Sequence, residues 1–278
     1  MTKLETRIEQ FKTDGYTIFS AVYDEAQMQN WREVLEFMQR EYVRGNAGMP
    51  APFWIGNMLE RAPRSMLPAI TQPDIFDFVE AIMGPFVQLD NLTLVGFPSA
   101  EKSDDLPVAS SWHRDRWAKM PNGYERPNAI NAITYFQELT DEYGPLRILP
   151  GSHVAPICLS PEERTQSLPG EKVIHVGAGD VVVIHNALLH SGSPNTSGKT
   201  RYFFSLFYNL TWLKTTDNHD GPNTRALIRD AREANDHRVL RLLGQDDNLE
   251  ARANSGFQTP DEPKWKEWAQ ADRDAIKT

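Results

Sequence analysis

The sequence predicts a mainly β fold, a sandwich or jelly roll, with helices before and after it along the chain. In residues 86–213, short apolar runs alternate with polar residues and are separated by Pro, Gly, Asp and Asn. A period of two is typical of strands, and many short strands without intervening helices are typical of sandwiches and jelly rolls. Residues 1–85 and 214–278 instead repeat their apolar residues at helix spacing, as in RALIRDAREAN and HRVLRLLG near the C-terminus.

The chain has 278 residues, a length that suits one β domain with appended helices as well as two average domains. We expect a single domain over residues 1–278, with 1–85 as helical support, 86–213 as the jelly-roll core and 214–278 as a helical extension. Hydrophobic residues make up 40% of the chain, which is enough to bury a core. The single cysteine, Cys158, excludes an internal disulfide and a thiolate-rich metal site, so any metal needs nitrogen and oxygen ligands.

The charge balance argues against nucleic acid and membrane partners. The formal net charge is −9, which repels phosphates and anionic lipid. The opening residues MTKLETRIEQFKTDGY lack the apolar core of a signal peptide, and no run approaches the roughly 20 apolar residues that span a bilayer. We expect a soluble, cytoplasmic protein that acts on a small molecule; its oligomeric state stays open, with a homodimer as one option.

The N-terminal region is expected to hold three helices and one short strand. Apolar residues recur at helix spacing in 4–11 and 28–42, and the β-prone GYTIF at 15–19 lies between them. A third helix is expected over 73–84, because Pro is favoured in the first turn and Gly just past the last. The segment 45–68, rich in Pro, Gly and Met, is predicted to be a loop and a candidate lid.

The strongest local signal for chemistry is the sequence WHRD at residues 112–115. Residues two apart in an extended segment point to the same face, so His113 and Asp115 can reach one metal together. His190, at the end of an apolar run, can supply a third ligand from another strand. Two imidazoles and one carboxylate on one face of an octahedron suit Fe(II) and leave three positions for a bidentate cosubstrate and O2.

Arg201 is the candidate that binds the carboxylate of such a cosubstrate. It opens the strand RYFFSLFYN, eleven residues after His190, and its planar guanidinium can bind a carboxylate through two parallel hydrogen bonds. An HxD pair alone is weak evidence, since chance pairs are common. The ordered set of aromatic-HxD, GPLRILPGSH, GDVVVIHNALLHSGSPN and Arg201 is more specific.

These motifs resemble those of the phytanoyl-CoA dioxygenase (PhyH-type) family of Fe(II)/2-oxoglutarate-dependent oxygenases. The matching blocks are WHRDRW, YGPLRILPGSH, GDVVVIHNALLHSGSPNTSGKTR and, near the N-terminus, FKTDGYTIFSAVYDEAQ. The resemblance implies a double-stranded β-helix, a cupin-like jelly roll, with His113, Asp115 and His190 on iron and Arg201 on 2-oxoglutarate. It also implies an enzyme that uses O2 to oxidise a small-molecule C–H bond and releases succinate and CO2.

Two departures from the family pattern concern the hydroxyl that helps Arg201. Family members often have Gly and then Ser directly after the second histidine, whereas this chain has Ser191-Gly192-Ser193. Many related oxygenases also have Ser or Thr two residues after the arginine, where this chain has Phe203. Ser191 and Ser193 are both candidates for this cosubstrate contact.

Further candidates lie on the strand NAINAITYF and in the loop after the HxD pair. Asn131 and Tyr135 share one face of the strand and contact cosubstrate or substrate if that face lines the barrel. In the loop, an arginine can orient an anionic substrate and two aromatic residues can form a wall, although all four can equally be packing and salt-bridging residues. These loop residues are Arg114, Arg116, Trp117 and Tyr124.

Three other histidines are interpreted without a metal role. His185, five residues before His190, turns to the opposite side by alternation and is expected to be structural. His153 follows a turn and is expected at the surface in preference to a substrate role. His175 alternates with apolar residues and is expected to be a half-buried strand residue.

The sequence leaves several reactions open. Related halogenases replace the carboxylate ligand by Gly or Ala, so the presence of Asp115 favours hydroxylation over halogenation. Desaturation, ring formation and epimerisation leave little trace in sequence. Two other functions are a cupin-like enzyme with another metal and no 2-oxoglutarate, against which Arg201 argues, and a non-catalytic jelly-roll protein, which should show a damaged ligand triad.

Overall fold

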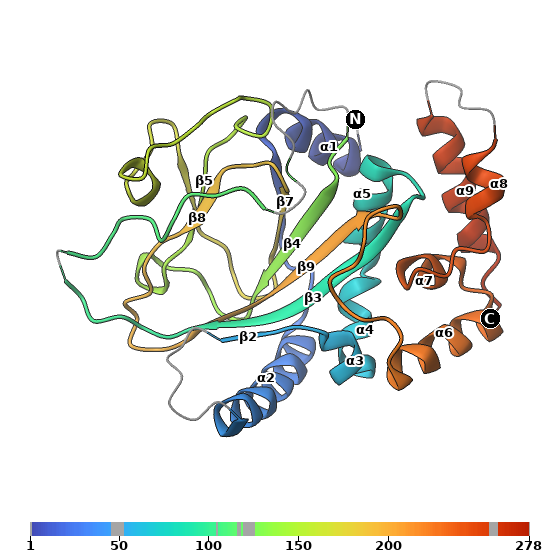
Figure 1. Ribbon diagram of the computed structural model, residues 1–278, viewed down its shortest axis with the longest axis horizontal. Coiled ribbons are helices and arrows are strands. Elements are labelled where there is room, and N and C mark those ends of the chain that lie inside the picture. Colours follow the sequence, from blue (N-terminus) through green and yellow to red (C-terminus); the bar gives the residue numbers. More distant parts are fainter. Residues whose placement is uncertain are drawn as a thin grey trace. The chain divides into compact units, whose positions relative to one another are not determined.

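The computed structural model describes residues 2–45, 53–103, 105–115, 118, 126–255 and 261–277. Its strands form a six-stranded sheet of order β1-β7-β4-β9-β3-β2 (Figure 1) and a three-stranded sheet of order β6-β5-β8. The chain divides into two compact units, Met1–Ile55 with Thr93–Ser205 and Gly56–Leu92 with Leu206–Thr278. The division falls inside β3 (Val87–Phe97) and β9 (Arg201–Leu210), so its limits differ from those expected from the periodicity, and a single domain stays a prediction.

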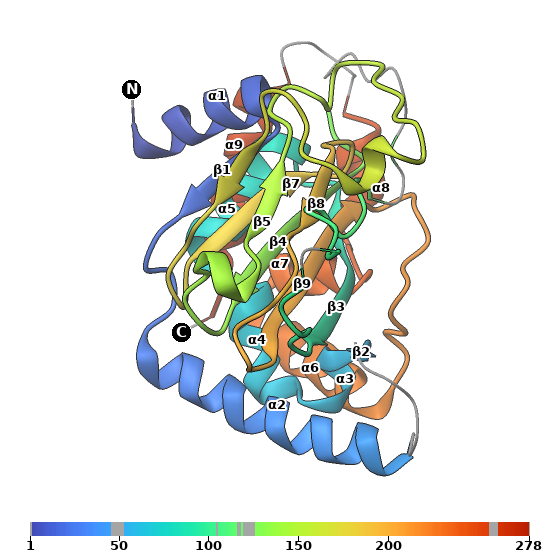
Figure 2. The same ribbon diagram turned by 90° about the vertical axis from the view of Figure 1, so that its left-hand side faces the viewer.

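The first unit contains two layers of strands with an apolar core between them. Figure 2 shows β5 and β8 in front of β7 and β4. The core contains Ile133, Ile148 and Val182, which come from both sheets. The strands are β1 (Tyr16–Phe19), β2 (Phe53–Ile55), β4 (Ala129–Tyr135), β5 (Leu146–Ile148), β6 (Lys172–Ile174), β7 (Val181–His185) and β8 (His190–Gly192). Both β7 and β4 are buried along their whole length; β7 reads as an apolar run, whereas β4 includes the buried polar residues Asn131 and Thr134.

Two long helices and two short 3-10 turns complete this unit. The first helix, α1 (Lys3–Asp14), begins with a capping box between Thr2 and Glu5 and ends at Gly15, whose φ of 82° suits glycine. A Cβ atom on Gly15 would lie 2.7 Å from the ring of His153, so the close packing also requires glycine here. The remaining elements are α2 (Glu25–Gly45) and the turns η1 (Asp141–Tyr143) and η2 (Glu163–Thr165).

The prediction that 45–68 is a loop was wrong for its described part. This part contains β2, α3 (Met58–Arg61) and the start of α4 (Pro63–Ile70). Only three residues carry the alternation of β2, with Phe53 and Ile55 buried and Trp54 exposed, which is too short a pattern to recognise in sequence. Pro63 occupies the first helical turn, where proline is favoured, so it marks a helix and not a loop. Residues 46–52 lie outside the described part of the chain.

The second unit contains the remaining helices. The predicted helix over 73–84 is confirmed as α5 (Pro73–Met83), with Gly84 as its C-cap at φ 74°. The helical patterns of the C-terminal tail are confirmed as α6 (Pro222–Ala234) and α7 (His237–Leu242), followed by α8 (Leu249–Ala253) and α9 (Glu262–Asp274). None of the helices in the described residues has the length and apolar character required to cross a membrane.

Candidate active site

The three predicted metal ligands come together in the first unit. His113, Asp115 and His190 each offer one ligand atom, and these atoms lie within 4.8 Å of one another. The backbones of His113 and His190 form an antiparallel bridge with two hydrogen bonds of 3.0 Å, which places their rings 4.3 Å apart. The amide of Asp115 donates to the carbonyl of Asn186 at 2.9 Å, and the side chains of His113 and Asp115 reach the same centre, as their spacing predicted.

Both histidines present the same ring nitrogen to this centre. The Nδ1 atom of His113 lies 2.8 Å from the carbonyl of Ser111, and that of His190 lies 3.0 Å from the carbonyl of Leu188. A carbonyl only accepts, so each Nδ1 carries the proton and each Nε2 keeps its lone pair. Burial lowers the pKa of His190, which favours the neutral, ligating form. This donor set fits Fe(II).

The carboxylate of Asp115 has different surroundings at its two oxygens. Its Oδ1 lies 3.6 Å from Nε2 of His190 and 4.0 Å from Nε2 of His113. Its Oδ2 accepts a hydrogen bond of 3.3 Å from Nδ2 of Asn131. The amide oxygen of Asn131 in turn accepts from the hydroxyl of Ser205 on β9 at 2.9 Å. The structure thus places Asn131 against a candidate metal ligand, and sequence reasoning missed Ser205.

Arg201 is a buried cation at the start of β9. Its Nη1 donates to the carbonyls of Gly144, Ser193 at 3.1 Å and Tyr143 at 3.3 Å. Its Nε is buried and has no hydrogen-bond partner among the described residues, and none of their carboxylates pairs with the guanidinium. Burial lowers the pKa of Arg201, but arginine stays charged in proteins. A buried cation with free donors fits the far carboxylate of 2-oxoglutarate.

Aromatic rings form a row beside Arg201. Tyr135 contacts Phe203 with ring centroids 5.3 Å apart, Phe203 stacks on Phe97 at 6.1 Å, and Phe97 contacts Trp54 edge-on at 5.7 Å. The guanidinium of Arg201 lies 5.1 Å from the ring centre of Phe97. Burial raises the pKa of Tyr135 to about 12, so this phenol is neutral at pH 7. Trp54 ends the row with 55% of its surface exposed, and sequence reasoning missed it.

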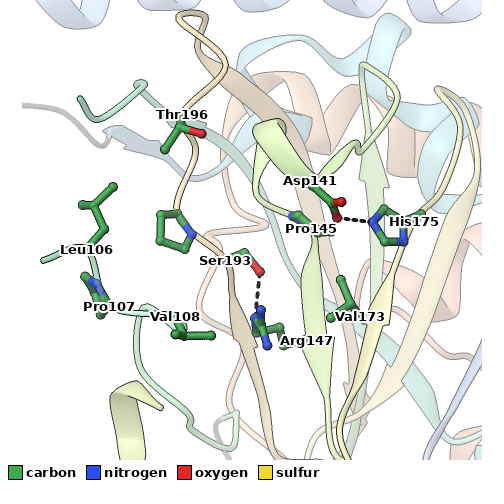
Figure 3. Close-up of a pocket in the computed structure, with 11 residues that line it drawn as sticks. Leu106, Pro107, Val108, Asp141, Pro145, Arg147, Val173, His175, Ser193 and Thr196 are labelled. Atoms are coloured by element: carbon green, nitrogen blue, oxygen red, sulfur yellow. Dashed lines mark hydrogen bonds and ion pairs between the residues drawn. The ribbon is translucent and has the colours of Figure 1, made fainter. Parts of the chain in front are cut away.

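Neither predicted serine hydroxyl bonds to Arg201 within the described residues. Figure 3 shows the hydroxyl of Ser193 pointing to Arg147, whose Nε donates to it at 2.8 Å, in a pocket of about 450 Å³. The hydroxyl of Ser191 accepts from the amide of Ser111 at 3.0 Å and so holds the HxD segment. The hydroxyl of Ser110, which sequence reasoning missed, borders the same space as Arg201: a Cβ on Gly192 would meet Nη2 of Arg201 at 3.3 Å and Oγ of Ser110 at 3.7 Å.

The contacts of Arg114 support its packing interpretation. Its Nε donates to the carbonyl of Ala187 at 2.9 Å, and its terminal nitrogens donate to the carbonyls of Ile157, Ser152 and Ala155 at 3.1 to 3.2 Å. All three guanidinium nitrogens of Arg114 therefore donate to backbone carbonyls, and the group does not offer two parallel unpaired donors to an anionic substrate. The other predicted loop residues, Arg116, Trp117 and Tyr124, lie outside the described residues.

Two of the other histidines differ from their predictions. His153 is fully buried and not at the surface, because α1 covers it: its Nε2 lies 3.0 Å from the carbonyl of Lys12. His175 is exposed and not half-buried, because β6 ends at Ile174, and it pairs with Asp141 at 2.6 Å (Figure 3). His185 is buried and its Nδ1 accepts from the amide of Ala187 at 2.9 Å, as a structural histidine would.

The buried histidine His185 predicts a loss of stability in acid. Burial, reinforced by His153 with its ring 5.0 Å away, lowers the pKa of His185 from 6.5 to about 3. Between these values the unfolded state binds the additional proton, so the free energy of unfolding falls by up to about 1.4 kcal/mol per pH unit as pH decreases. His185→Asn, which keeps an acceptor near Nδ1, should flatten this dependence between pH 6.5 and 4.5 in urea unfolding of metal-free protein. Equal slopes in the wild type and His185→Asn would contradict the assignment.

Known proteins support the family identified from the motifs. Residues 97–203 match the model of the family described as phytanoyl-CoA dioxygenase (PhyH). L-proline trans-4-hydroxylase from Streptomyces griseoviridis is 28% identical over 130 residues, covering 37% of this chain and 48% of that protein. The match thus spans about half the length of this curated relative.

Solved structures share the fold at low sequence identity. HygX from Streptomyces hygroscopicus, with nickel and 2-oxoglutarate bound, is 16% identical and has a TM-score of 0.60 over 77% of this chain and 89% of HygX. The non-haem, α-ketoglutarate-dependent epimerase SnoN from nogalamycin biosynthesis is 20% identical and has a TM-score of 0.54 over 75% of this chain and 81% of SnoN. The predicted jelly-roll fold of the 2-oxoglutarate-dependent oxygenases is confirmed. The resemblance to the phytanoyl-CoA dioxygenase family is confirmed over part of the chain: the matching segment, residues 97–203, contains all three candidate metal ligands and Arg201.

Proposed function

We propose that this chain is an Fe(II)/2-oxoglutarate-dependent dioxygenase that hydroxylates a C–H bond of a small molecule. The observation that carries the proposal is the triad itself. Two histidines with protonated Nδ1 atoms turn their Nε2 lone pairs toward one oxygen of Asp115. A site that only packs or that holds a surface ion pair would not fix both tautomers in this way.

Each group of this chain has a separate task in the proposed reaction. When bound, iron and 2-oxoglutarate supply the oxidising chemistry, in which O2 is consumed and succinate and CO2 are released. His113, Asp115 and His190 hold the metal, and Arg201 binds the far carboxylate of 2-oxoglutarate. Ser110, whose hydroxyl lies next to the space over Gly192, is the candidate for the additional hydroxyl contact. The row of aromatic rings limits water around Arg201, which strengthens its attraction for a carboxylate.

A small-molecule substrate is supported by the nature of the relatives. The curated relative is named a proline hydroxylase, while the structural neighbours include an epimerase and an enzyme solved with hygromycin B. Hydroxylation is the outcome we favour, because the partly matching sequence relative is a hydroxylase and Asp115 is intact. Trp54, exposed at the end of the aromatic row, is a candidate substrate contact. A cytoplasmic location and a homodimer stay predictions.

An anaerobic titration tests the cofactor chemistry directly. Fe(II) and 2-oxoglutarate added to the protein should produce the weak visible charge-transfer band of the chelated cosubstrate. His113→Ala removes one ligand and should abolish the band. His175→Ala removes an exposed histidine outside the site and should leave it unchanged.

The same titration can contradict the proposal. A folded, iron-loaded wild-type protein without the band would exclude the 2-oxoglutarate assignment and favour a cupin-like enzyme. A band that persists in His113→Ala would show that the metal binds elsewhere. If the band behaves as expected, release of succinate provides the assay for a substrate screen.

A further inference from the structure

We propose that Asn131 and Ser205 form a relay that positions Asp115 as a metal ligand. In this relay the amide of Asn131 holds one carboxylate oxygen, and the hydroxyl of Ser205 fixes the orientation of the amide. The inference rests on the metal site proposed above and replaces the cosubstrate contact that the sequence predicted for Asn131. Both are positioning residues, because the three ligand atoms come from other side chains.

The two carboxylate oxygens of Asp115 have different roles in the relay. Oδ1 is the atom that faces both histidine Nε2 atoms, at 3.6 and 4.0 Å. Oδ2 faces the amide nitrogen of Asn131 at 3.3 Å. A carboxylate can turn about its Cβ–Cγ bond, and a donor to one oxygen fixes the torsion angle at which the other oxygen faces the two histidines. Asn131 therefore keeps Oδ1 directed at the metal.

The orientation of the Asn131 amide follows from its two neighbours. An ionised carboxylate only accepts hydrogen bonds, so the group that faces Asp115 must be the NH2 of Asn131 and not its oxygen. The amide oxygen then faces Ser205, 2.9 Å away, whose hydroxyl can donate. A flip of the amide would place its oxygen against the carboxylate of Asp115, two acceptors against each other, and would lose the hydrogen bond that the Ser205 hydroxyl donates.

Burial makes the relay difficult to replace by water. Asn131 is 3% exposed and Ser205 is 6% exposed, and they lie on neighbouring strands β4 and β9 of one sheet (Figure 1). Ladder contacts to β7, where Asn131 pairs with Ile184, fix the backbone of β4. In such a site a lost donor leaves the carboxylate oxygen without a partner, and hydrogen-bond partners of metal ligands commonly change metal affinity.

Titration with the metal alone tests the relay. Asn131→Leu keeps a similar volume but removes the donor, and should weaken binding of Co(II) or Fe(II), without 2-oxoglutarate, by roughly 10- to 100-fold. The control is Thr134→Val, on the same strand but facing the other side, whose buried hydroxyl has no hydrogen-bond partner among the described residues. Urea unfolding of metal-free protein verifies that each variant folds.

A double-mutant cycle separates the relay from a merely structural role of Ser205. Ser205→Ala should weaken metal binding in the wild type by a smaller factor than Asn131→Leu does, and Ser205→Thr, which keeps a hydroxyl, should restore much of it. In the Asn131→Leu background Ser205→Ala should have no further effect, because Ser205 acts only through the amide. An equal effect of Ser205→Ala in both backgrounds would contradict the relay.

The metal titration distinguishes failure of the relay from failure of the proposed function. If the wild-type protein binds neither Co(II) nor Fe(II) stoichiometrically, both the metal site and the relay are excluded. Wild-type binding that Asn131→Leu does not weaken overturns the relay but leaves the enzyme assignment intact. Metal binding that weakens as expected, combined with no charge-transfer band, supports the relay and excludes 2-oxoglutarate.

Discussion

Replacing Arg201 by alanine should weaken binding of 2-oxoglutarate by roughly 10²- to 10³-fold and leave metal binding intact. The expectation follows from burial: Arg201 is 6% exposed, and a buried charge pair that loses one partner typically costs about 3 to 5 kcal/mol. Without the guanidinium, the far carboxylate of 2-oxoglutarate is desolvated without a counterion. The measurement is the dependence of the charge-transfer band on 2-oxoglutarate concentration in Fe(II)-loaded protein.

A second arginine provides the matched control. Arg147 contacts the same short segment of chain, since it donates to the Ser193 hydroxyl while Arg201 donates to the Ser193 carbonyl. It also pairs with Glu171 and lines the pocket of Figure 3. Arg147→Ala should therefore leave the affinity for 2-oxoglutarate unchanged. Unchanged affinity in Arg201→Ala would show that another group binds the far carboxylate.

Lysine at position 201 tests which property of arginine matters. Lysine keeps the charge but replaces the planar fork by a single ammonium group, so it cannot form two parallel hydrogen bonds. Arg201→Lys should therefore bind 2-oxoglutarate more weakly than the wild type and more tightly than Arg201→Ala. Affinity equal to that of Arg201→Ala would mean that the charge alone contributes little.

The ligand triad and Arg201 were predictable because their signals are local. Residues two apart in a strand share a face whatever the rest of the fold does, so His113 and Asp115 could be paired from their spacing. His190 and Arg201 follow in a fixed chain order that the family motifs preserve. The structure adds contacts that the sequence does not show, namely the carbonyls on the Nδ1 atoms and the carbonyls around the Arg201 guanidinium.

The relay and the buried His153 were not predictable because their contacts are distant in sequence. Asn131 and Ser205 lie 74 residues apart, and only the pairing of strands reveals that they meet. His153 follows a turn, which suggested the surface, but α1 covers it, and the contact residue Lys12 lies 141 residues earlier in the sequence. Trp54 was missed because β2 has only three residues, in a segment whose composition is typical of loops.

Glu80→Gln should lower the free energy of unfolding of the second unit by about 3 kcal/mol, because two arginines lose a buried carboxylate. Glu80 on α5 is 5% exposed and pairs with Arg241, which is fully buried, and with Arg238 at 2.6 Å. Glutamine keeps the volume and removes only the charge. Arg241 retains Asp272 on α9 at 3.5 Å, so the effect should lie at the lower end of the range for broken buried pairs. Urea unfolding measures the difference.

The contrast with Asp77 shows why burial and not the number of ion pairs decides this effect. Asp77, on the same helix, also contacts two arginines, Arg238 at 2.6 Å and Arg273 at 3.3 Å, but its side chain is 40% exposed. Water can solvate its partners when the charge is removed, so Asp77→Asn should cost about 1 kcal/mol or less. Equal losses in the two variants would mean that Arg241 is solvated in the folded state. A large loss in Glu80→Gln alone would identify the buried pairs of Glu80 with Arg241 and Arg238 as contacts that fix α5 against α7 in this unit.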